Sequence, residues 1–183
     1  MNLSHHFLLA MPSLDNDSVF HQSVVYLCEH GESGALGLIV NKPSPVNMEI
    51  VFAAIGKPTP EKLQGQFVMM GGPVQPERGF VLHTPTGEWE SSLHINNSLA
   101  LTTSRDIIDG LAKDEAIDAA ILTIGCSQWS AGQLERELAQ NAWLVAPADM
   151  EILFDTPIEE RYNAALGKLG VDAAHLMGEG GNA

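Results

Sequence analysis

Apolar and polar positions divide the chain into short hydrophobic runs separated by turn-forming residues, a pattern typical of a domain rich in short strands. Residues 21–30 and 35–41 are two such runs, and the short segment GESG between them predicts a β-hairpin. The apolar positions of these runs are nearly continuous rather than alternating. Both faces of this hairpin should therefore be covered by other parts of the core.

A second pair of runs, residues 67–70 and 80–83, flanks the loop GGPVQPERG. Gly71 and Gly72 can take backbone angles that are closed to other residues, whereas the two prolines of the loop fix their own. We therefore predict a strand, a rigid loop and a returning strand. A loop held in one shape and ending at Arg78 is a favourable place for a ligand to bind.

The remaining elements are predicted from apolar runs and capping signals. Further strands are expected at residues 4–10, 91–95, 99–103, 120–125 and 142–147. A helix over residues 48–55 should begin at the N-cap Asn47 and stop at Gly56. Three more helices are indicated by the capping pairs Thr103 with Asp106, Ser130 with Gln133, and Thr156 with Glu159; the second can close at Asn141 and the third at Gly170.

Composition places the chain among ordinary globular proteins, and residues 1–183 fit one domain. Nine Lys and Arg against 23 Asp and Glu give a formal net charge of −14, which disfavours direct binding to nucleic acids or anionic membranes. No apolar run approaches the roughly 20 residues of a membrane span, and the N-terminus lacks the basic segment of a signal peptide. We therefore expect a cytoplasmic protein without membrane contact.

Successive blocks of the chain resemble the YqgE/AlgH family of bacterial proteins, and the resemblance covers nearly the whole chain in order. The blocks are FLLAMPSL, SVVYLCEH followed by GALGLIVNKP, MGGPVQPERGFVLH, SLALTTSRDII, the stretch around WSAGQLERELAQNAWL, and PADMEILFDTPIEERY. The resemblance implies an α/β (α+β) fold with a mixed, partly barrel-like β-sheet surrounded by helices. At residues 125–129 the chain has G-C-S-Q-W where the family pattern is G-Y-x-G-W.

The resemblance assigns no reaction, because the family has no established activity and no accepted catalytic residues. One member's name is linked to regulation of alginate synthesis, which suggests a regulator, including a transcriptional one. The residues themselves offer one enzymatic alternative, a small hydrolase-like enzyme acting at the surface formed by Gly71–Arg78 and Ser127–Trp129. Ser127 or Cys126, with His83 as base, would form a hydrolase-like site if the segment after the strand 120–125 were a nucleophile elbow, but Trp129 replaces the second glycine of that motif.

Metal and redox sites have weak support in the sequence. His5 and His6 are adjacent and should point to opposite faces of a strand, and only Cys28 with His30 places two ligand types on one face, whereas zinc requires three or four ligands. The two cysteines lack a C-x-x-C pattern and fit reduced thiols. No common nucleotide-binding fingerprint follows a strand. We therefore expect neither a metal nor a cofactor.

The strongest candidate site combines the glycine loop with the start of the helix near residue 105. If the fold brings these segments together, scarce arginines, hydroxyls and backbone amides could meet an anion. The candidate ligand-binding residues are Gly71, Gly72, Arg78, Thr103, Ser104, Arg105 and Trp129. We accordingly expect a protein that acts by binding either a small anionic ligand or a protein partner. A pocket lined by these residues would favour the ligand, and a flat apolar patch the partner.

Overall fold

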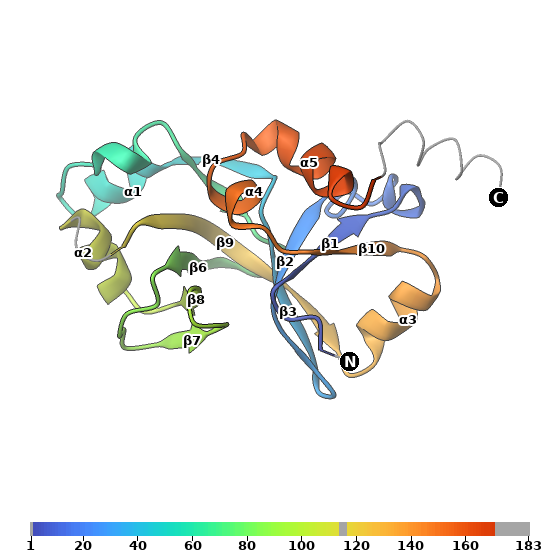
Figure 1. Ribbon diagram of the computed structural model, residues 1–183. Helices are drawn as coiled ribbons and strands as arrows, with labels where there is room; N and C mark the ends of the chain where they lie inside the picture. Colours follow the sequence, from blue (N-terminus) through green and yellow to red (C-terminus); the bar gives the residue numbers. More distant parts are fainter. Residues whose placement is uncertain (1, 114–116, 171–183) are drawn as a thin grey trace.

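The fold is organised around a curled, mixed β-sheet, seen in the computed structural model, which describes residues 2–113 and 117–170 (Figure 1). The main path of the sheet is β10-β1-β2-β3-β9-β6-β8-β7, and β5 joins β9 and carries β4. The strands within the described residues are β1 (His6–Ala10), β2 (Val24–Gly31), β3 (Gly34–Ile39), β4 (Pro43–Asn47), β5 (Phe67–Met70), β6 (Val74–Thr84), β7 (Ser92–His94), β8 (Ala100–Thr102), β9 (Ala119–Ser130) and β10 (Trp143–Pro147). Only the β5–β9 pair is parallel among these strands.

Short helices surround the sheet, as the family resemblance implies. In the described part of the chain they are α1 (Met48–Ala54), α2 (Asp106–Ala112), α3 (Gln133–Ala139), α4 (Met150–Phe154) and α5 (Arg161–Gly167), with single 3-10 turns at Pro12–Leu14, Glu61–Leu63 and Ile158–Glu160. Helices α1 and α2 lie together at one end of the molecule, α3 lies at the other, and α4 and α5 lie over β9 and β1 (Figure 1). The predicted fold class is confirmed.

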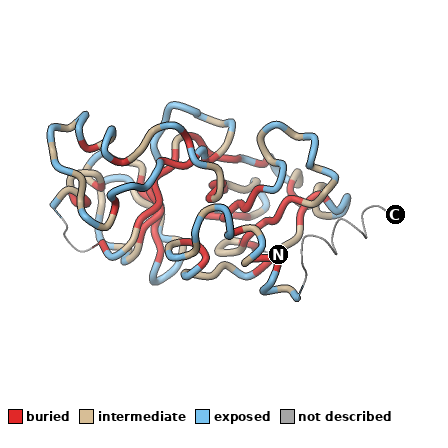
Figure 2. Tube along the Cα trace, turned by 90° about the horizontal axis from the view of Figure 1, so that it is seen from above, coloured by how far each residue is buried: buried red, intermediate tan, exposed pale blue. Residues whose placement is uncertain are grey.

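The predicted hairpin of residues 21–41 is formed by β2 and β3, which pair antiparallel. Its side chains alternate between two cores: Val24 and Tyr26 belong to one apolar cluster, and Val25 and Leu27 to another. All four are fully buried. Buried positions follow the strands through the interior, whereas exposed positions lie on the outer loops (Figure 2). Both faces of the hairpin are therefore covered, as the continuous apolar pattern predicts.

Strand β9 is the central element, because it pairs with three others. It lies antiparallel to β6 over residues 119–126 and to β3 over residues 127–130, and parallel to β5 at Thr123 and Ile124. The strand predicted for residues 120–125 thus exists but continues to Ser130. Because residues 125–127 lie inside this strand, the strand-to-helix turn that a nucleophile elbow requires is absent there.

The predicted hairpin between residues 67–70 and 80–83 is wrong, although both strands exist. Strands β5 and β6 do not pair with each other; each pairs with β9. The glycine loop crosses β9 instead of turning back beside it. A Cβ atom at Gly71 would lie 2.3 Å from the Gly125 carbonyl oxygen, and one at Gly72 would lie 2.3 Å from that of Cys126. These glycines are therefore required by backbone contact with β9.

The capping signals are realised unevenly. Asn47 accepts a hydrogen bond from the Ile50 amide at 2.9 Å, as predicted for α1. Asn141 takes a left-handed conformation after α3, with φ of 58°. The other signals are partly displaced. The Gln133 side chain reaches back to the Ser130 amide, but the N-cap of α3 is Gly132, while the Thr156 hydroxyl donates to the Glu151 carbonyl and the helix that follows begins at Arg161.

Candidate functional site

A cavity of about 330 Å³ lies between the helices α1 and α2 and the strands β6 and β9. Four of the predicted ligand-binding residues line it, namely Arg78, Thr103, Ser104 and Arg105. They come from β6 and from the loop between β8 and α2, so the fold brings together two segments that the sequence only suggests as neighbours. The rest of the lining is mainly apolar, with Val51, Val68, Phe80, Val81, Ile107, Ile108, Leu122 and Ile124.

Arg78 is presented by an irregularity in β6. Val74 pairs with Cys126 and Gly79 with Ile124, so the residues between them bulge out of the ladder. The Arg78 Nη1 atom donates a hydrogen bond to Gln75 Oε1 at 3.0 Å, and its guanidinium lies 5.6 Å from the centre of the Phe80 ring. The exposed side chain is therefore positioned by an amide and an aromatic face rather than by a carboxylate.

Arg105 lies at the N-cap position of α2 and is exposed. Within residues 2–113 and 117–170, neither Arg105 nor Arg78 forms an ion pair. Both guanidinium groups retain free N–H donors at the same cavity, and a guanidinium fork matches the oxygens of a carboxylate or phosphate. The two arginines thus line one cavity without a carboxylate partner among the described residues of a strongly acidic protein.

The hydroxyl groups of this site stabilise the loop that carries Arg105. The Ser104 Oγ atom accepts a hydrogen bond from the Ser91 amide at 2.9 Å and donates one to the Asp106 carboxylate. This second bond lowers the pKa of Asp106. Thr103 Oγ1 and Ser91 Oγ lie 3.0 Å apart and share a hydrogen bond. The capping pair predicted between Thr103 and Asp106 is not formed: the N-cap of α2 is Arg105, which makes no side-chain capping bond, and Ser104 bonds to Asp106 instead. The hydroxyls of Thr103 and Ser104 position the loop.

A neighbouring cavity of about 350 Å³ shares Arg78, Phe80 and Thr103 with the first. It is more polar, because Gln75, Ser91, Ser92 and Gln128 also line it. Arg78 therefore lies between a mainly apolar cavity and a more polar one. Sequence reasoning missed Gln75 and Phe80, which hold Arg78, although an amide three residues before an exposed arginine and an aromatic two residues after it were visible signals.

The other predicted site residues lie elsewhere. Gly71 and Gly72 pack against β9 and do not line the cavity. Trp129 is buried, with 6% of its surface exposed, in the core beneath α3. Its indole Nε1 donates to Glu137 Oε1 at 3.0 Å. The structure therefore brings Arg78, Thr103, Ser104 and Arg105 together and separates them from Gly71, Gly72 and Trp129.

The groups proposed for a hydrolase-like site are buried and already bonded. Ser127 Oγ donates to the Gly71 carbonyl at 3.1 Å, and burial raises the pKa of the Cys126 thiol. His83 pairs with Ala120, six residues along β9 from Cys126, which is about 20 Å in an extended strand. The base and the nucleophile therefore cannot meet.

His83 has a structural role in the core. It is fully buried; its Nε2 lies 2.7 Å from Thr102 Oγ1 and its Nδ1 lies 3.0 Å from the Pro85 carbonyl oxygen. A carbonyl can only accept, so Nδ1 carries the proton and Nε2 accepts from Thr102. Burial lowers the pKa of His83. The neutral imidazole thus joins β6 to β8.

The cysteines are also core residues. Cys28 and Cys126 are free and buried, and burial raises the pKa of the Cys28 thiol. They lie on β2 and β9, which are separated by β3, so their Cα atoms are roughly 9 to 10 Å apart, beyond disulfide reach. Neither thiol has the depressed pKa of a reactive cysteine.

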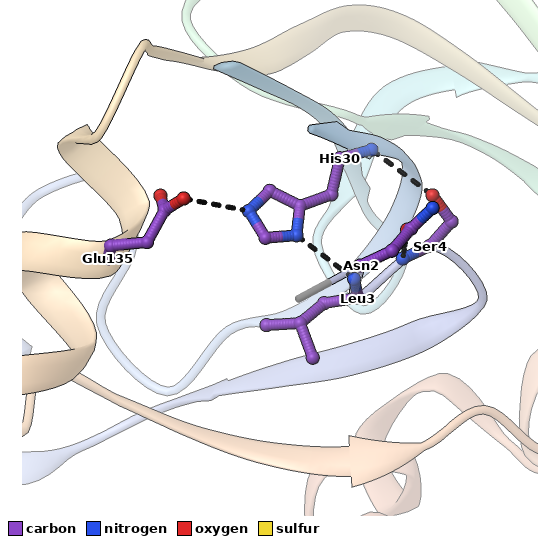
Figure 3. Close-up of polar contacts among 5 residues, drawn as sticks. All are labelled: Asn2, Leu3, Ser4, His30 and Glu135. Carbon is purple, nitrogen blue, oxygen red and sulfur yellow. Dashed lines mark hydrogen bonds and ion pairs between the residues drawn. The ribbon is translucent and has the colours of Figure 1, made fainter. Parts of the chain in front are cut away.

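His30 also has a structural role (Figure 3). Its Nδ1 accepts a hydrogen bond from the Leu3 amide at 2.9 Å, so Nε2 carries the proton and faces Glu135 Oε2 at 3.4 Å. The Ser4 hydroxyl accepts from the His30 amide at 3.1 Å. This imidazole joins the N-terminal segment, β2 and α3. Within the described residues, no group of three or more His, Cys, Asp or Glu side chains could hold a metal ion.

A family model and several proteins of other bacteria match this chain over most of its length. The model of a family described as AlgH-like matches residues 7–174. The chain belongs to the AlgH-like family. A protein of Neisseria meningitidis serogroup B named only as a UPF0301 protein is 56% identical over 183 residues, covering all of both chains, and a UPF0301 protein of Chromobacterium violaceum is 49% identical over all of this chain and 98% of its own.

Two solved structures support the fold. The solution structure of AlgH from Pseudomonas aeruginosa matches with a TM-score of 0.80 and 43% identity, covering 97% of this chain and 94% of that one. A crystal structure of a Corynebacterium diphtheriae protein matches with a TM-score of 0.72 at 22% identity, covering 90% and 85% of the two chains, and supports the fold alone.

None of the described helices has the length and apolar content needed to cross a bilayer.

Proposed function

We propose that this protein acts by binding a small anion that carries an apolar group, in the cavity between α1, α2 and the sheet. The supporting observation is that Arg78 and Arg105 line one cavity without a carboxylate partner in the described chain. On a protein with a formal net charge of −14, two arginines without a described carboxylate partner at one cavity favour an anionic ligand there. The carboxylate or phosphate of the ligand would bind the arginines.

The walls of the cavity define the rest of the ligand. Side chains from five elements, including Val51, Val81, Ile107 and Leu122, form an apolar lining. An inorganic anion would leave this lining in contact with water, whereas an acyl or aromatic group would cover it, at about 25 cal/mol per Å² of apolar area buried. The site therefore favours an amphipathic anion over a bare one.

A small ligand is favoured over a protein partner by the distribution of exposed apolar side chains. Ile50, Phe67 and Met70 are the large exposed ones in the described chain. Phe67 and Met70 are three residues apart on β5 and therefore point to opposite faces of that strand. They do not form a single flat apolar surface of the kind that docks a protein.

The proposal is tested by titrating the protein with octanoate and octyl phosphate, using 1-octanol as the uncharged comparison, in calorimetry. We expect an anion to bind more tightly than octanol. Arg78→Ala and Arg105→Ala should each weaken binding roughly tenfold or more, since a charge-assisted hydrogen bond contributes about 1.5 to 3 kcal/mol. Arg136→Ala, which removes an exposed arginine of α3, is the matched control. Equal binding of octanol, or equal effects of all three substitutions, would refute the proposal.

A further inference from the structure

A separate cavity of about 270 Å³ is lined by Arg161 at the start of α5, the only buried lysine or arginine among the described residues. Only 8% of its surface is exposed. The cavity lies between α4 and the strands β5 and β9, and it shares only Leu122 with the lining of the Arg78–Arg105 site. It is therefore a distinct place in the fold.

Two of the three guanidinium nitrogens of Arg161 are fixed by backbone carbonyls. Nε donates to the Thr156 carbonyl at 2.9 Å, and Nη1 donates to the Val40 carbonyl at 2.6 Å. These bonds hold the guanidinium plane between the end of β3 and the segment that precedes α5. An arginine held in this way presents its remaining donors in a fixed direction.

The third nitrogen, Nη2, has no partner in residues 2–113 and 117–170. Nη2 is not among the fully enclosed atoms that lack a hydrogen-bond partner, so it reaches solvent, and Arg161 lines this cavity. No described carboxylate forms an ion pair with Arg161. Burial lowers the pKa of the Arg161 guanidinium, an effect that the nearby charge of Glu159 partly offsets, and this lowering reflects the cost of keeping the charge there.

The cavity has an apolar wall and an acidic rim. Met48, Phe67 and Met69 contribute the wall. Asp155 and Glu159 also line the cavity, and both are exposed. A simple anion that bound Arg161 would meet repulsion from these two carboxylates. A ligand with an ammonium group beside its carboxylate would pair with both signs of charge.

We propose that this cavity binds a small zwitterion of the amino-acid class. Its carboxylate accepts from Nη2 of Arg161, its ammonium group faces Asp155 and Glu159, and its apolar side chain contacts Met48, Phe67 and Met69. This inference is independent of the Arg78–Arg105 site, because the two cavities use different charged residues.

The test compares L-leucine with two analogues that each lack one charge, 4-methylpentanoate and 3-methylbutan-1-amine, by calorimetry and by NMR titration of the full chain. Leucine should bind, and each analogue should bind at least about tenfold more weakly, because each loses one ion pair in a partly buried site. The backbone amides near Val40, Thr156 and Arg161 should shift with leucine. Absence of leucine binding, or equal binding of either analogue, would overturn the proposal.

Substitutions in the protein test the contacts of the ligand's ammonium group and of its carboxylate separately. Asp155→Asn with Glu159→Gln should weaken leucine but not 4-methylpentanoate, and the control Glu151→Gln, which removes an exposed acid of α4 outside the cavity, should change neither. Arg161→Lys keeps a charge but cannot bridge two carbonyls, so its fold is first checked by circular dichroism. If the acid double variant binds leucine as the parent does, the ammonium site is refuted, whatever the fold of the lysine variant.

Discussion

The indole N–H groups of Trp129 and Trp143 donate hydrogen bonds to the same carboxylate oxygen, Oε1 of Glu137, at 3.0 and 2.9 Å. The two rings pack edge to face, with centres 6.1 Å apart. Strand β9, strand β10 and helix α3 are thus joined at one acceptor. This relationship explains why Trp129 is a structural residue and not a platform for a ligand.

Replacing the shared acceptor should destabilise the protein. Glu137→Ala leaves two largely buried indole donors without a partner, and we expect a loss of about 2 to 4 kcal/mol in the free energy of unfolding, since hydrogen bonds to a charged group contribute about 1.5 to 3 kcal/mol each. Glu137→Gln keeps one acceptor oxygen and should cost less. Urea unfolding followed by tryptophan fluorescence measures both, and equal stability of the alanine variant and the parent would contradict this role.

Glycine is required where the loop after β5 crosses β9. In Gly72→Ala the new Cβ atom would lie 2.3 Å from the Cys126 carbonyl oxygen, at a φ of 153°. We expect a loss of about 3 kcal/mol or more from overpacking and backbone strain. The matched control is Gly79→Ala on β6, where no atom lies within 4 Å, and it should change stability by less than about 1 kcal/mol. Denaturant unfolding compares the two, and similar losses would refute the explanation.

Stability should fall in mild acid because of His83. Burial lowers the folded-state pKa of this imidazole below its ordinary value of 6.5, so the unfolded chain binds the proton more readily. The stabilisation is complete above pH 6.5 and is lost as the pH falls towards the folded-state pKa. His83→Asn should flatten the unfolding free energy against pH in this range, whereas His21→Gln, at an exposed position, should preserve the slope. An unchanged slope in His83→Asn would contradict the assignment.

Asp149 should contribute through its cap more than through its ion pair. Its Oδ1 accepts from the Ile152 amide at 3.1 Å, and its Oδ2 lies 2.9 Å from Lys168 Nζ, a contact that lowers the pKa of the carboxyl. Asp149→Ala should cost about 1 kcal/mol through loss of the N-cap. Asp149→Asn keeps a capping oxygen and should cost less, because an exposed ion pair contributes about 0 to 1 kcal/mol. Thermal unfolding ranks them; a larger loss in the asparagine variant would reverse this assignment.

Local signals in the sequence predicted which segments form strands and helices better than they predicted which strands pair with each other. The hairpin of residues 21–41 joins adjacent runs through a short turn, and the Asn47 cap acts within one helical turn, so both could be predicted and both are confirmed. The pairing of β5 and β6 with β9 could not be predicted, because nothing in the residues near Gly71 specifies a partner strand some fifty positions away.

The residues of the candidate sites were likewise predictable only where a local signal marked them. Arg78 and Arg105 were recognisable as scarce cations beside turn signals, and the structure places both at one cavity. The apolar lining of that cavity depends on contacts between α1, α2 and β9, which no short motif records. Arg161 gave no signal, because an arginine in a short helix ordinarily faces water, and only the fold shows that its guanidinium points inward to Val40.

The position of β9 between β5 and β6 also constrains how the chain acquires its shape. Met70 is the last residue of β5 and Val74 is the first residue of β6. Their partners on β9, Ile124 and Cys126, are synthesised roughly fifty residues later. Until then, one edge of each earlier strand has no backbone partner and can pair with another chain. Productive assembly on the ribosome therefore waits for a single late segment, and a nascent chain stalled before it is the form most exposed to aggregation.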